Sequence, residues 1–131
     1  MDAKSQSAVE FVVLATFMLL VILGFFAIIS SRVLEAKEEA NIRIAEDITD
    51  FALKEIEIAK SLNDGYTRTF IMPITVNGVD YLINMTDNRE LLVNYLGYEH
   101  IKFLPSNVTG NISRGLVMIT KNNGIITLTA I

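Results

Sequence analysis

The sequence predicts an α+β protein in which a small antiparallel β-sheet head packs on one long N-terminal α-helix. Residues 11–31 form an apolar run without a charged side chain. Helical periodicity then continues to Leu62, and beyond Gly65 apolar residues alternate with polar ones between turn signals. The change of period at Gly65 therefore separates a helical first half from a strand-rich second half.

The apolar run has the length and composition of a membrane span. Residues 11–29 are rich in Leu, Ile, Val and Phe, and about 20 apolar residues cross the hydrocarbon core of a bilayer. A secretory signal peptide is the alternative interpretation. However, no A-x-A-like cleavage site closes the run, and the helical pattern continues past Ser30 and Ser31. We therefore expect the span to be retained in the mature protein.

Residues 32–64 predict an amphipathic continuation of the same helix. One stripe is apolar and recurs at three- and four-residue steps: Ile44, Ile48, Phe51, Ala52, Ile56, Ala59 and Leu62. No proline precedes Pro73, so nothing forces a break between the span and the stripe. Asn63, Asp64 and Gly65 predict the end of the helix, with Gly65 at the left-handed position that follows the last turn.

Residues 65–131 predict the β-rich head. Residues 69–76 and 79–86 flank Asn77-Gly78, which is a strong hairpin signal. Pro73 marks the first of these segments as an edge strand or a bulge.

A second hairpin is predicted from residues 115–120 and 125–131, which flank residues 121–124. Between the two hairpins, residues 89–98 predict a short helix and residues 100–104 a short strand. We expect the strands to form one small sheet over the apolar stripe of the helix.

Composition excludes several classes of function. The chain has 131 residues, no cysteine and a formal net charge of −4. Nucleic acid is an unlikely partner, because binding phosphate needs clustered Lys and Arg. The single histidine, His100, has no second His or Cys with which to form a metal site, and residues 87–90 lack the spaced ligands of a calcium loop and predict a turn or helix start. We predict no catalytic site, no metal and no cofactor.

An acidic residue lies at the start of the apolar run. A carboxylate at the centre of a span costs roughly 2.5–3.5 kcal/mol to insert, but Glu10 lies at the edge and can reach the headgroup layer. With Gln6 before it and Leu14 after it, Glu10 resembles the start of type IV pilins, and more closely the archaeal pilins with class III signal peptides. Their pattern is Q-x-S-x-E-x-x-x-L. This chain departs from it at Ala8, where the family prefers Ser, and Ser5 stands where many members have Gly before the cleavage point.

The resemblance covers about the first quarter of the chain and implies a processing and assembly route. A prepilin peptidase would remove residues 1–5 by cutting between Ser5 and Gln6. Residues 6–31 would then form the hydrophobic transmembrane and filament-core helix, residues 32–64 its amphipathic continuation and residues 65–131 the head. Glu10 and Leu14 would act in assembly, with Glu10 meeting the new amine of Gln6 on a neighbouring copy.

The same resemblance implies partners and a location. The partners would be copies of this chain in a helical filament, the prepilin peptidase, and the assembly ATPase with its membrane platform. The precursor would reside in the membrane, and the mature chain in an extracellular filament for adhesion or surface contact. The alternative hypothesis is a single-pass membrane-anchored extracellular binding domain that does not polymerise, which accounts for the span but not for Gln6 and Glu10.

Three sequons occur in the head, at Asn84, Asn107 and Asn111. Each has the N-x-[ST] pattern that accepts N-linked glycans on exported proteins. Asn107 and Asn111 flank Gly110 in a segment with turn-like composition, from which a glycan would project outward. Asn84 falls within an expected strand, so its use requires that its side chain face solvent.

Overall fold

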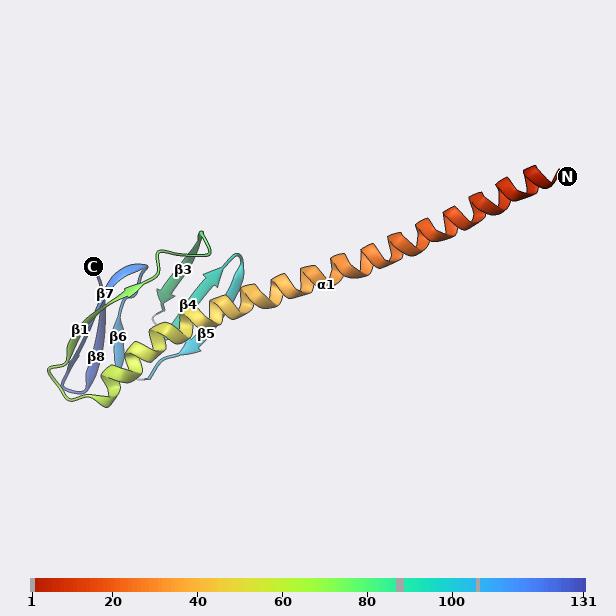
Figure 1. The fold of residues 1–131 in the computed structure, drawn as a ribbon. Coiled ribbons are helices and arrows are strands. Elements are labelled where there is room, and N and C mark those ends of the chain that lie inside the picture. Colours follow the sequence, from red (N-terminus) through yellow and green to blue (C-terminus); the bar gives the residue numbers. More distant parts are fainter. Residues whose placement is uncertain (1, 87–88, 106) are drawn as a thin grey trace. The chain divides into compact units, whose positions relative to one another are not determined.

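A computed structural model of the chain describes residues 2–86, 89–105 and 107–131. It contains one helix, α1 (Ala3–Ser61), followed by eight strands (Figure 1). The predicted α+β fold with a long apolar N-terminal helix is confirmed. The chain divides into two compact units, residues 1–38 and residues 39–131.

The first unit is the apolar part of α1. Its large side chains from Val9 to Leu34 are exposed, so within this chain the helix here is held by its own backbone hydrogen bonds and not by packing. Thr16 is the polar residue within residues 11–29, and its hydroxyl donates to the carbonyl oxygen of Val12 at 2.8 Å. Because this bond satisfies the hydroxyl within the helix, Thr16 leaves no unpaired donor on the apolar surface of the segment.

The second unit contains residues 39–61 of α1 and all the strands. These are β1 (Thr67–Met72), β2 (Thr75–Val76), β3 (Val79–Met85), β4 (Glu90–Tyr95), β5 (Tyr98–Phe103), β6 (Val108–Gly110), β7 (Gly115–Asn122) and β8 (Ile125–Ala130). They form two four-stranded sheets rather than the one expected, with strand orders β1-β7-β8-β6 and β2-β3-β4-β5. Every pairing is antiparallel except that of β6 with β8, which is parallel.

Pro73 lies where the chain passes from one sheet to the other. Residues 69–76 were expected to form one strand, but β1 ends before Pro73 and pairs with β7, whereas β2 follows it and pairs with β3. Both strands are at sheet edges, as the proline predicts. The turn at Asn77 and Gly78 is confirmed, with φ angles of 52° and 74°, and so is the second hairpin, which turns at Asn123 and Gly124.

The short helix predicted over residues 89–98 is wrong, because this segment contains strand β4 and the turn into β5. Its buried residues, Leu91, Val93 and Tyr95, recur at every second position, which is the period of a strand. Leu96 and Gly97 then form the turn with positive φ angles of 51° and 85°. The strand expected over residues 100–104 is confirmed as β5, with slightly earlier bounds.

The helix buries a stripe rotated from the predicted one. Ile48, Ala52, Ile56 and Ala59 are buried as expected, but so are Ala45, Thr49 and Glu55. Phe51 and Leu62, expected in the stripe, are each 42% exposed, and Ile44 is half-buried. The core joins this stripe to both sheets through buried residues such as Phe70, Val117, Ile126, Leu91 and Tyr95.

Polar contacts fix the helix to the sheets. Glu55 forms an ion pair with Arg68 of β1 at 3.5 Å, and Asp50 one with Lys102 of β5 at 3.6 Å. The two pairs thus join α1 to different sheets, at the margins of the apolar contact made by its buried stripe.

Lys121 of β7 closes the end of α1. Its Nζ atom donates to the carbonyl oxygens of Lys60 and Leu62, at 2.9 and 2.6 Å, which lack partners within the helix. Gly65 does have a positive φ of 91°, but α1 ends at Ser61. The glycine therefore belongs to the turn before β1 and not to the helix cap that was predicted.

Candidate functional site

The processing and assembly residues named from the sequence lie in the first turns of α1. The side-chain amide of Gln6 donates to a carboxylate oxygen of Glu10 at 3.4 Å, and both side chains are exposed. Leu14 lies one further turn along the same face. Together with Val13 and Phe17, Leu14 and Glu10 line a shallow apolar groove on the helix surface. The structure thus brings Gln6, Glu10 and Leu14 together on one side of the segment.

The bond between Ser5 and Gln6 lies inside the helix. The backbone amides of Ser5 and Gln6 both donate to the carbonyl oxygen of Asp2, at 2.9 and 3.2 Å. A peptidase that cuts here must open this first turn, and turns at helix ends fray most easily. Removal of residues 1–5 would leave Gln6 as the first residue, with its amine one turn from Glu10.

The apolar run has no covered face within its own chain. Large side chains on every side of α1 from Phe11 to Ile29 are exposed, including Phe11, Phe17, Phe25 and Phe26. A helix that is apolar all round is normally buried in a large core or in a membrane. Among the described residues, α1 is the helix with the length and composition to span a membrane. This long apolar helix is consistent with membrane insertion.

The three sequons differ in how their side chains are used. Asn84 lies on β3 with its side chain exposed, and its Oδ1 accepts from the amide of Met85 at 2.8 Å. Asn111 is exposed as well, and its Oδ1 accepts from the amide of Ile112. Asn107 is half-buried, and its Nδ2, the atom that a glycan would occupy, donates to the carbonyl oxygen of Gly124 at 3.0 Å.

The segment between Asn107 and Asn111 is a strand and not the turn expected from its composition. β6 pairs with β8 through all three of its residues. Gly110 has a φ of 107°, and a Cβ atom there would collide with the carbonyl oxygen of Leu128. Glycine is therefore required at this position by close packing against β8.

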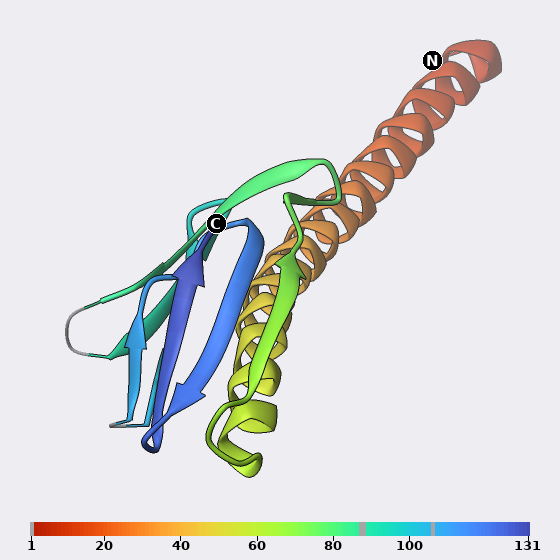
Figure 2. The same cartoon turned by 90° about the vertical axis from the view of Figure 1, so that its left-hand side faces the viewer.

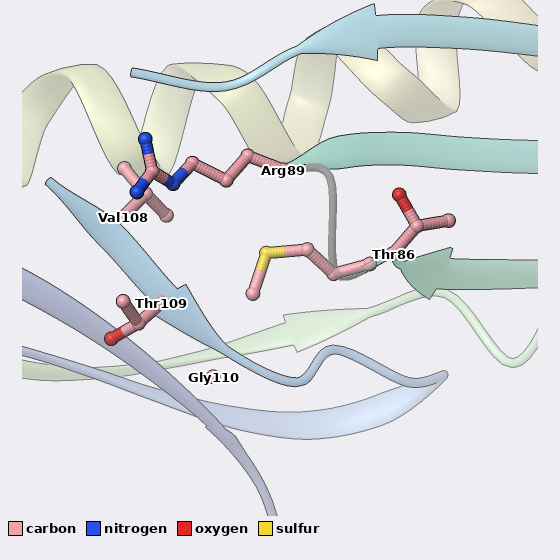
Figure 3. A pocket seen from close by; sticks show the side chains of 6 residues that line it. Thr86, Arg89, Val108, Thr109 and Gly110 are labelled. Atoms are coloured by element: carbon pink, nitrogen blue, oxygen red, sulfur yellow. The ribbon is translucent and has the colours of Figure 1, made fainter. Parts of the chain in front are cut away.

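A small recess opens beside β6, at the ends of β3 and β4 (Figure 3). It has a volume of about 300 Å³, and Figure 3 shows Arg89 extending past Val108, with Thr86 and Thr109 on its walls. The described lining residues supply one guanidinium and two hydroxyls but neither His nor carboxylate. They therefore provide no pair for acid–base catalysis.

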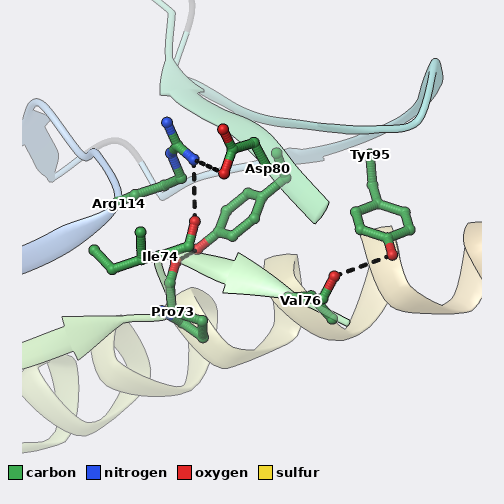
Figure 4. Close-up of polar contacts among 7 residues, drawn as sticks. Pro73, Ile74, Val76, Asp80, Tyr95 and Arg114 are labelled. Carbon is green, nitrogen blue, oxygen red and sulfur yellow. Dashed lines mark hydrogen bonds and ion pairs between the residues drawn. The ribbon is translucent and has the colours of Figure 1, made fainter. Parts of the chain in front are cut away.

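Arg114 joins the two sheets in a second polar cluster (Figure 4). One guanidinium nitrogen lies 2.9 Å from Asp80 of β3 and donates to the carbonyl oxygen of Ile74 at 3.0 Å. The adjacent Tyr81 donates its hydroxyl to the carbonyl oxygen of Pro73. Burial raises the pKa of Tyr81 to about 12, against the opposing effect of the Arg114 charge. The cluster is structural, because it fixes the crossover between the sheets.

Sequence reasoning missed these contacts, because their members are far apart in the chain and carry no shared motif.

His100 lies on β5 opposite Val93, and its Nε2 is buried without a hydrogen-bond partner among the described residues. No group of three His, Cys, Asp or Glu side chains within the described part of the chain could hold a metal ion. Asp87 and Asn88 of the segment considered for calcium lie outside the described residues, and Glu90 begins β4.

Comparison of the chain with models of known protein families, with curated proteins and with solved structures finds no match. Inferences about function therefore rest on the residues and geometry described above.

Proposed function

We propose that this protein is a structural subunit of an extracellular type IV pilus-like filament. A prepilin peptidase releases residues 1–5, and the assembly ATPase with its membrane platform moves the mature chain from the membrane into the filament. The chain holds the filament together by packing its apolar helix against the helices of other copies. Its head supplies the outer surface for adhesion or contact, and the exposed sequons make the filament a glycoprotein.

The observation that carries this proposal is the exposure of the apolar run on every side of α1. Exposed apolar surface of this extent is not tolerated by a soluble monomer. Mutual packing covers it in many copies at once, and burial is worth about 25 cal/mol per Å² of apolar surface. A contact that repeats from copy to copy without closing into a ring produces an open helical polymer.

The position of Glu10 favours a filament over a simple membrane anchor. An anchor needs only apolar residues, whereas a carboxylate at the edge of a buried helix needs a cation close by. The amine of a processed Gln6 on a neighbouring copy supplies one, and the groove formed by Val13, Leu14 and Phe17 lies beside the carboxylate. This arrangement gives neighbouring copies a defined register.

The test is electron microscopy of material sheared from cells that express the chain, with an antibody against the head. We expect thin fibres that the antibody labels along their length. Labelled protein that stays in the membrane fraction as monomers, under conditions that permit assembly, would support the second candidate, an anchored binding domain.

A further inference from the structure

The outer face of the sheet β1-β7-β8-β6 carries no charge along its three long strands. Figure 2 shows these strands side by side. In β1, β7 and β8, which the structure describes in full, the buried residues alternate with outward ones, and each outward residue is Thr, Asn or apolar. Thr67, Thr120 and Thr127 form one row across the strands. The face is thus free of charge although 20% of the chain is charged.

One row of this face is apolar and exposed. Ile71 of β1 lies opposite Leu116 of β7, and the amide of Ile131 donates to the carbonyl oxygen of Leu116 at 3.0 Å. The side chains of Ile71, Leu116 and Ile131 are 64%, 46% and 72% exposed. These three side chains therefore form an exposed apolar row, and contiguous exposed apolar surface often marks a site of interaction.

The second sheet presents a different outer face. Its outward positions include Asp80, Glu90 and Glu99, one on each of β3, β4 and β5, together with the sequon residue Asn84. Three acidic side chains and a glycan acceptor suit a surface that stays in water. The two outer faces of the head therefore differ in charge although both carry exposed apolar side chains.

We propose that the charge-free face of β1, β7 and β8 contacts a second copy of this chain, with Ile71, Leu116 and Ile131 at the centre of the contact. This inference rests on the proposed filament function. Each copy has a formal net charge of −4, so copies repel one another wherever acidic faces meet. The charge-free face is the one on which two copies meet without that repulsion, and depletion of charge is characteristic of the core of protein interfaces.

Single cysteines provide the test, because the chain contains none of its own. L116C and T129C place a thiol on the charge-free face, and L82C, on the outer face of β3, is the matched control. Maleimide labelling of detergent-solubilised monomers should modify all three thiols. In filaments, we expect L116C and T129C to react at least about tenfold more slowly than in monomers, since interface cores exclude water, while L82C keeps its rate.

The outcomes separate the two proposals. Filaments in which L116C and T129C react as fast as L82C, or in which L82C alone is protected, would overturn the contact face and leave the filament function intact. Failure of the unsubstituted chain to form filaments would overturn both. Assembly of L82C together with loss of assembly in both L116C and T129C, with monomer folding unchanged by circular dichroism, would support the contact face.

Discussion

Glu10 is an exposed carboxylate at the edge of an apolar segment, and its surroundings would change on assembly into the proposed filament. In the single chain it accepts a weak hydrogen bond from Gln6 and is open to water. Packed among other helices, it would lose that water, and an unpaired buried charge is strongly unfavourable. Its role is therefore expected in the register of neighbouring copies and not in the fold of the chain that carries it.

We predict that E10Q is processed and folds normally but yields far fewer filaments, because the amide cannot pair with the amine of Gln6. Filament yield from sheared cells measures the effect, and circular dichroism of the solubilised chain checks the fold. E38Q, which removes an exposed carboxylate from the same helix, is the control and should assemble normally. Wild-type filament yield from E10Q would show that this carboxylate merely marks the membrane boundary.

Tyr81 makes stability depend on pH in the alkaline range. Its pKa is raised from 10.0 to about 12 in the folded chain, so the folded state keeps the proton that the unfolded state loses. Stability is thus fully present below pH 10 and falls as the pH rises from 10 towards 12. Denaturant unfolding of a soluble fragment of residues 33–131 across this range should show the fall, and Y81F should flatten it. An equal slope in Y81F would contradict the assignment to Tyr81.

The sequons should differ in occupancy. Attachment at Asn107 would break the bond from its Nδ2 to Gly124, whereas Asn84 and Asn111 are exposed and use only their Oδ1 atoms in the contacts seen within the described residues. We expect the intact mass of the exported chain to fall by one glycan in N84Q and in N111Q, and by none in N107Q. A glycan peptide mapped to Asn107 alone would contradict this order.

At the scale of the elements, local signals predicted most of the structure. The apolar run, the two Asn-Gly-type turns and Pro73 each act through neighbouring residues, and each appears in the structure at its expected place. A helix was predicted in place of β4 because Leu91, Leu92, Tyr95 and Leu96 also fit helical spacing. The turn that follows β4 was not predicted because a leucine, here Leu96, rarely has a positive φ. The parallel pair of β6 with β8 and the division into two sheets depend on distant partners, which no local pattern reveals.

The same limit applies to the buried face of α1. Ile44, Phe51 and Leu62 are apolar and were therefore expected in the buried stripe. Which residues of α1 are buried depends, however, on the side chains that the sheets place against it, and these cover Thr49 and Glu55. Thr49 donates its hydroxyl to the carbonyl oxygen of Ala45 at 2.9 Å, which satisfies this buried group. Glu55 is held by its ion pair with Arg68, although its Oε2 atom has no hydrogen-bond partner among the described residues. Hydropathy identifies neither residue as buried, so it predicts a stripe rotated from the observed one.

The last part of α1 belongs to the core of the head. We predict that a fragment of residues 33–131 is soluble, folded and monomeric, because it keeps the buried stripe through Ala59. A fragment of residues 65–131 should aggregate, since it loses Ile48 and Ile56, each worth about 1.5–3 kcal/mol of burial. Size-exclusion chromatography and circular dichroism compare the two. A soluble, well-folded monomer from residue 65 onward would show that the helix is dispensable.

At the scale of the whole molecule, an exposed apolar helix and a head with its own buried core occur in one chain. In the proposed filament route, the helix would meet lipid before assembly and other helices afterwards, whereas the head has its own core from residue 45 onward. Heads joined only by the weak contact of their charge-free faces would remain monomers at ordinary concentrations. Helices that hold many heads together would raise the effective concentration of the heads, and the contact between their charge-free faces would then form.

We predict that this chain is processed before Gln6 and then polymerises. Intact-mass spectrometry of the chain recovered from purified surface fibres tests both parts at once. We expect fibres to contain the chain. After glycan removal, its mass should be that of a chain that begins at Gln6. A chain recovered only from membranes, with a mass that still includes residues 1–5, would contradict both the processing and the polymerisation.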